Sequence, residues 1–88
     1  MTEEEFKNQL TNEGFLDIYV QDDPASFEYP THTHEKLTVH IILEGEMTMT
    51  DISGQKLLKA GQRFDVPAGT THSAKMGTEG CKYIVAEK

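Results

Sequence analysis

Three of the four histidines lie close together in the chain, and imidazole is a common ligand of transition metals. His32 and His34 are separated by one residue, His40 follows in an apolar segment, and His72 comes after the turn-forming sequence Pro-Ala-Gly-Thr-Thr. Side chains two apart in a strand point to the same face, so His32 and His34 can offer two nitrogens to one ion. A third nitrogen, from His72 on a distant strand, would complete a site for a divalent transition metal, with Fe, Zn, Ni, Mn and Cu as candidates.

The sequence leaves the fourth ligand open. If strand alternation continues beyond His34, then Thr38 and His40 share its face, and His40 can also reach the metal. Four neutral imidazoles would fill a tetrahedral site, which favours a structural metal over a catalytic one. Glu35 faces away unless a bulge inverts the alternation. The alternatives are that His40 only lines the pocket, and that none of the histidines holds a metal.

Short strands must position these histidines. Alternating apolar residues between Gly- or Pro-containing breaks predict strands near residues 15–20, 37–43, 47–52, 55–58, 63–66, 71–76 and 81–86. Thr2 and Glu5 have the spacing of a capping box, and Phe6 and Leu10 share a helical face, which predicts a helix over residues 3–11. We expect one domain over residues 1–88, with the helix in residues 1–14 and an all-β barrel in residues 15–88.

The histidines and their turns resemble the two sequence motifs of the cupin superfamily. His32 and His34 stand at the motif's distance before Gly45. The second motif is matched in order and spacing by Gly61, Pro67, Gly69 and His72. The resemblance implies a small jelly-roll β-barrel of two facing sheets. It also implies that His32, His34 and His72 are ligands of a divalent metal.

Three positions depart from the cupin motifs. Ser26 stands in place of the opening glycine, Thr38 in place of the glutamate ligand, and Met76 in place of the final asparagine. Without the glutamate, three neutral histidines leave the charge of the ion uncompensated, so the site should favour an anionic ligand. The cupin superfamily includes three-histidine sites of this kind, in proteins that activate dioxygen.

Four further residues are candidates for binding a substrate, namely Tyr29, Thr38, Met76 and Tyr83. The tyrosines can donate hydrogen bonds in a pocket, with barrel packing as the alternative. We expect a metalloenzyme acting on a small polar or anionic molecule, of dioxygenase or isomerase type. The alternatives are a non-catalytic sensor of a small ligand or metal, and a barrel whose metal is structural. No general base other than the histidines is evident.

Composition narrows the classes of partner. The formal net charge of -7 and the lack of clustered Lys and Arg argue against binding to nucleic acid or to an anionic membrane surface. Cys81 is the only cysteine, so no intramolecular disulfide forms, as suits a reducing cytoplasm. The acidic N-terminus is unlike an export signal, and no apolar run is long enough to span a bilayer. A chain this short has a small core, which favours a homodimer.

Overall fold

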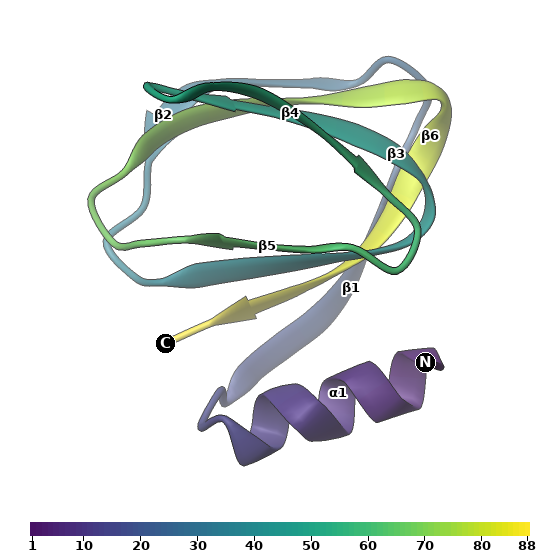
Figure 1. Ribbon diagram of the computed structural model, residues 1–88, viewed down its shortest axis with the longest axis vertical. Coiled ribbons are helices and arrows are strands. Elements are labelled where there is room, and N and C mark those ends of the chain that lie inside the picture. Colours follow the sequence, from purple (N-terminus) through teal and green to yellow (C-terminus); the bar gives the residue numbers. More distant parts are fainter.

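A helix followed by six antiparallel strands makes up the computed structural model, which describes residues 1–88 (Figure 1). The elements are α1 (Glu3–Asn12), β1 (Asp17–Asp23), β2 (Glu28–Thr33), β3 (Thr38–Asp51), β4 (Gly54–Lys59), β5 (Arg63–Val66) and β6 (Thr71–Glu87). This confirms the all-β class with a short N-terminal helix. The helix is not long or apolar enough to cross a membrane.

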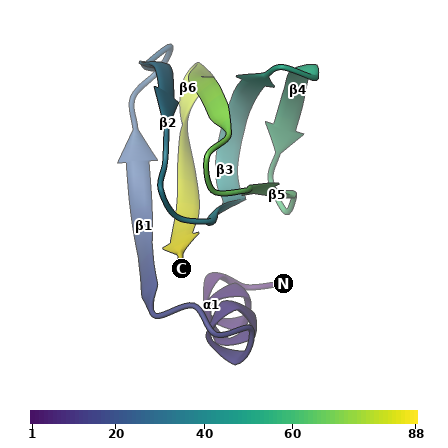
Figure 2. The ribbon, with the colours of Figure 1, turned by 90° about the vertical axis from the view of Figure 1, so that its left-hand side faces the viewer.

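The long strands β3 and β6 pair with each other and bring the other strands together. The register runs from Thr38 opposite Glu87 to Thr50 opposite Ser73. At one end of this pair, β5 joins β3 and β1 joins β6; at the other end, β4 joins β3 and β2 joins β6. Because both long strands bend, the sheet folds over into two facing layers around an interior (Figures 1 and 2).

The bends lie at Gly45 and Gly80, both with φ of +80°. At Gly45 a Cβ would collide with the Gly80 carbonyl oxygen, so the two strands approach closely where they turn. We predicted strand breaks at residues 44–45 and 77–80, and this was wrong. Glycine lets the backbone turn while pairing resumes on the far side, so residues 37–43 and 47–52 fall within one strand, as do residues 71–76 and 81–86.

Two predictions near the N-terminus also need correction. The first strand begins at Asp17 rather than at Phe15, because the Phe15 amide caps the helix by donating to the Leu10 carbonyl and the ring packs in the core. We predicted that His32 and His34 share a strand, but β2 ends at Thr33, so only His32 lies in it, and the strand extends back through Pro30 to Glu28. Proline is tolerated there because β2 pairs on one side only and its register shifts between Tyr29 and His32.

Two apolar cores lie on opposite faces of the β3–β6 pair. The inner core, between the two layers, consists of Ile42, Met47, Met49, Leu58, Met76, Cys81, Tyr83 and Val85. The outer core, on the side of α1, consists of Leu10, Phe15, Val39, Ile41, Ile84 and Ala86. The predicted capping box is confirmed: Thr2 and Glu5 bond each other's backbone amides at the start of α1. Residues 38–42 are buried on both faces because they separate the two cores.

Candidate functional site

Three histidine side chains meet between the two layers. His32 and His72 are directly opposite each other in the β2–β6 pair, and their ring centroids are 4.4 Å apart. The His34 ring lies 4.7 Å from His32 and 5.1 Å from His72. One nitrogen from each ring can be chosen so that all three lie within 4.8 Å of one another. Nitrogens bound to one zinc ion lie about 3–4 Å apart, so small ring rotations would suffice.

Two of the three rings are held in the same way. Nδ1 of His32 lies 2.6 Å from the carbonyl oxygen of Pro30, and Nδ1 of His72 lies 3.3 Å from that of Thr70. A bond to a carbonyl needs the proton on Nδ1, which leaves the lone pair on Nε2. Ligating histidines commonly make such a bond with the other ring nitrogen, because it fixes the orientation of the ring.

The turn in the second motif positions His34 as well as His72. His34 follows the end of β2, and its carbonyl accepts a hydrogen bond of 2.9 Å from the Gly69 amide. The turn itself closes through a bond of 3.2 Å from the Thr70 amide to the Pro67 carbonyl. The same turn therefore leads directly into β6 and holds the loop that carries His34.

His40 is not part of the group of three clustered histidines. Its ring is 6.5 Å from that of His72 and 6.0 Å from that of Tyr83. The side chain is 8% exposed, and its buried Nδ1 has no hydrogen-bond partner. Burial, reinforced by the imidazoles of His72 and His34, lowers the pKa of His40 to about 4. Burial also lowers the pKa of His72.

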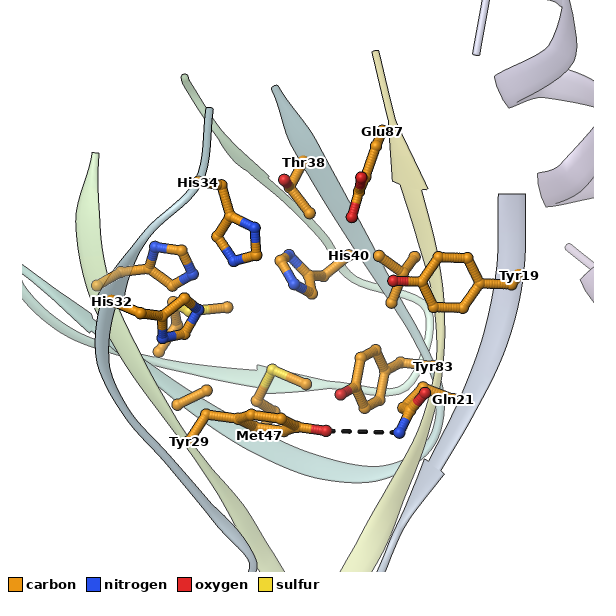
Figure 3. Close-up of a pocket in the computed structure, with 14 residues that line it drawn as sticks. Tyr19, Gln21, Tyr29, His32, His34, Thr38, His40, Met47, Tyr83 and Glu87 are labelled. Carbon is orange, nitrogen blue, oxygen red and sulfur yellow. Dashed lines mark hydrogen bonds between the residues drawn. The ribbon is translucent and has the colours of Figure 1, made fainter. Parts of the chain in front are cut away.

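The histidines line a pocket of about 150 Å³, here called the barrel pocket. Aromatic and apolar side chains form half of its lining, and the polar groups converge from β1, β2, β3 and β6 (Figure 3). The lining consists of Tyr19, Gln21, Tyr29, His32, His34, Thr38, His40, Met47, Met49, His72, Ala74, Tyr83, Val85 and Glu87. A cavity of this size accepts a molecule of roughly benzene dimensions.

A buried carboxylate supports the tyrosines of the barrel pocket. Asp23 is 5% exposed and accepts hydrogen bonds from the hydroxyls of Tyr29, at 2.8 Å, and Tyr83, at 2.7 Å. Gln21 Nε2 donates to the other carboxylate oxygen at 3.0 Å. Burial raises the pKa of both tyrosines, and the bond to Asp23 raises it further, so their hydroxyls keep their protons.

Comparison with known proteins agrees with this geometry. The family model described as a cupin domain matches residues 18–87. The chain belongs to the cupin family. This confirms the resemblance seen in the motifs. No curated protein matches the chain.

Several solved structures share the cupin fold of this chain. The DMSP lyase DddQ from Ruegeria pomeroyi DSS-3 is 25% identical, with a TM-score of 0.74 over 81% of this chain and 36% of that one. An RmlC-like cupin from Shewanella frigidimarina NCIMB 400 is 26% identical, with a TM-score of 0.72 over 83% of this chain and 66% of that one. A cupin-2 domain containing protein from the same organism is 21% identical, with a TM-score of 0.70 over 93% and 90%, and shows the fold alone.

The other residues singled out in the sequence take different places in this cupin. Tyr29, Thr38 and Tyr83 line the barrel pocket, whereas Met76 packs in the inner core and does not line it. Glu35 is exposed and outside the histidine cluster. The cluster contains no carboxylate, and Thr38 donates its hydroxyl proton to the Lys36 carbonyl, so the three imidazoles form a neutral donor set.

The strand predicted over residues 15–20 stops short of part of β1 that shapes the barrel pocket. Tyr19 and Gln21 line the pocket, and Asp23, on the same side of the strand, bonds its tyrosines. Their period-two spacing was the available signal. Glu87 was also missed, because it falls at the end of β6, beyond the last predicted strand.

Proposed function

We propose that this cupin binds a divalent transition metal through His32, His34 and His72 and holds a small polar or anionic molecule beside it in the barrel pocket. The observation that supports this is the cluster of three imidazoles whose nitrogens lie within 4.8 Å, at the wall of a pocket large enough for a small ligand. Imidazole nitrogen suits Zn, Fe, Ni and Cu. When bound, such a metal supplies a Lewis-acid centre that polarises a coordinated oxygen.

The chain's own residues fit this role. The carbonyls of Pro30 and Thr70 hold two of the rings with Nε2 free, which is the arrangement that ligation requires. Three protein ligands leave a coordination position open to the pocket, which favours ligand binding over a closed structural site. Since all three are neutral, an anionic oxygen would offset the charge of the ion.

We further propose that the metal site catalyses a reaction of dioxygenase or isomerase type. The lyase among the similar structures is an enzyme, and this chain aligns with 36% of it, so the similarity supports the fold more than any one reaction. A non-catalytic sensor would use the same metal and pocket without turnover.

The metal is tested with protein purified without a histidine tag. We expect equimolar metal in the wild type and none in His34→Ala, measured by plasma mass spectrometry, with an anomalous-scattering map locating the ion. His40→Ala is the matched control, because His40 lies outside the cluster and its loss should leave the metal content unchanged. Equal metal content in the wild type and His34→Ala would contradict the proposal. Loss of metal in both variants would instead indicate a four-histidine site.

A further inference from the structure

The tyrosine end of the barrel pocket differs chemically from the histidine end. The hydroxyls of Tyr29 and Tyr83 both donate to one oxygen of Asp23, Oδ2, while Gln21 donates to Oδ1. Asp23 does not itself line the pocket. In Figure 3 the hydroxyls of both tyrosines lie near Gln21, at a distance from the ring of His34. The carboxylate therefore sets the direction of the hydroxyl protons without contacting the ligand.

A phenol has one proton, so a tyrosine that donates to Asp23 can offer a ligand only its oxygen lone pairs. Tyr29 Oη is 3.5 Å from Gln21 Nε2, which uses part of its accepting capacity. Tyr83 Oη accepts no hydrogen bond from Gln21, although burial and the nearby Tyr29 hydroxyl on the same carboxylate oxygen both raise its pKa. Glu87 also lines the pocket, but it lies beside Thr38, away from the hydroxyls of Tyr29 and Tyr83 (Figure 3). The tyrosine end of the pocket thus presents acceptor oxygens, with the Asp23 carboxylate bonded to both hydroxyls.

We infer that the ligand of the barrel pocket is a short zwitterion, with an anionic oxygen for the histidine end and an ammonium or similar N–H donor for the tyrosine end. The inference rests on the proposed function, because the metal attracts the anionic oxygen. An acceptor-rich wall would repel a second carboxylate and would leave its own lone pairs unpaired against an alkyl group. The volume of about 150 Å³ suits a ligand of roughly six to eight non-hydrogen atoms.

The test compares two probes of equal size, β-alanine and butyrate. β-Alanine carries an ammonium group where butyrate carries a methyl group. Each is titrated into metal-loaded wild-type protein and into protein treated with a chelator, and binding is followed by calorimetry and amide NMR shifts. A hydrogen bond to a charged group leads us to expect at least about tenfold tighter binding of β-alanine in the loaded protein. In the chelated protein both should bind more weakly, with β-alanine still preferred.

Asp23→Asn separates recognition by the tyrosines from chelation by the amine. The new amide can donate to the tyrosine oxygens, which frees their protons to point into the pocket, so the preference for β-alanine should fall towards equality. Asp22→Asn is the matched control, because Asp22 is exposed and on the opposite face of β1, and it should keep the preference. The wild-type comparison needs no variant, so it stands even if Asp23→Asn fails to fold.

The outcomes separate this inference from the proposed function. The inference is overturned if the two probes bind equally, if butyrate binds more tightly, or if neither binds. Equimolar metal in the same protein would still support the proposed metal site. A preference that Asp23→Asn leaves unchanged would also overturn it, because chelation by the amine would then explain the result. If the protein takes up no metal, the proposed function fails, and the preference in the chelated protein still decides the inference.

Discussion

At the scale of single residues, the histidines of this cupin have different surroundings that suit different roles. His32 and His72 each have Nδ1 held by a backbone carbonyl, which leaves Nε2 free. His40 is buried between the cluster and Tyr83, with an unpaired Nδ1. Protonating a buried imidazole beside other imidazoles is unfavourable, so His40 makes the fold sensitive to acid.

We expect the metal-free protein to lose stability as the pH falls from about 6.5 to about 4. In that range the unfolded chain binds a proton at His40 and the folded chain does not, so acid favours unfolding. The stabilisation is fully present above about pH 6.5, and about 3 kcal/mol of it is lost by pH 4. Urea unfolding of the wild type and His40→Gln at several pH values measures this. The variant should show a flatter dependence, and parallel curves would contradict the assignment.

At the scale of elements, β3 and β6 supply both ends of the barrel pocket. In β3, His40 lies before the bend and Met47 lies after it. In β6, His72 lies before the bend and Tyr83 lies after it. Both strands turn at glycines that contact each other. Each bend therefore places the two halves of its strand on opposite sides of the pocket, which closes it.

We expect Gly45→Ala to destabilise the fold more than Gly61→Ala. Both glycines have positive φ, at +80° and +87°, so each substitution costs about 1–2 kcal/mol of backbone strain. A Cβ at Gly45 also collides with the Gly80 carbonyl, whereas a Cβ at Gly61 meets nothing within 4 Å. The collision should add at least about 2 kcal/mol. Denaturant unfolding of both variants gives the comparison, and equal losses would show that the strands separate easily at the bend.

At the scale of the whole molecule, the site and the helix belong to different cores. The inner core surrounds the barrel pocket, and the outer core attaches α1 to the other face of the β3–β6 pair. Stability and ligand binding can therefore be altered separately.

Leu10→Ala should lower the free energy of unfolding by about 3 kcal/mol, because Leu10 is fully buried in the outer core. The metal content should stay equimolar at temperatures where the variant is folded, since no residue of the outer core lines the pocket. Thermal unfolding with and without metal, together with elemental analysis, measures both effects. Loss of metal from folded Leu10→Ala would show that the two cores are coupled.

The homodimer and the cytoplasmic location expected from the sequence remain predictions. Sedimentation velocity over a range of concentrations would test the first, with a mass near twice that of the chain as the expected result.

The sequence by itself determined the fold class, the helix and the three clustered histidines. The helix follows from a local rule, because Thr2 and Glu5 form a capping box within one turn. The three histidines follow from the spacing of the two cupin motifs, although His34 lies just beyond the end of β2. The turn before His72 likewise depends on neighbours along the chain.

Only the tertiary structure decided which strands are continuous, where His40 lies and what stands opposite the histidines. Tyr83 bonds Asp23 across sixty residues, and β1 reaches the pocket only because it pairs with the last part of β6. Such long-range pairings depend on how distant strands are brought together, and a local pattern does not contain that information. The acceptor-rich end of the pocket is therefore a property of the fold, although every residue in it is written in the sequence.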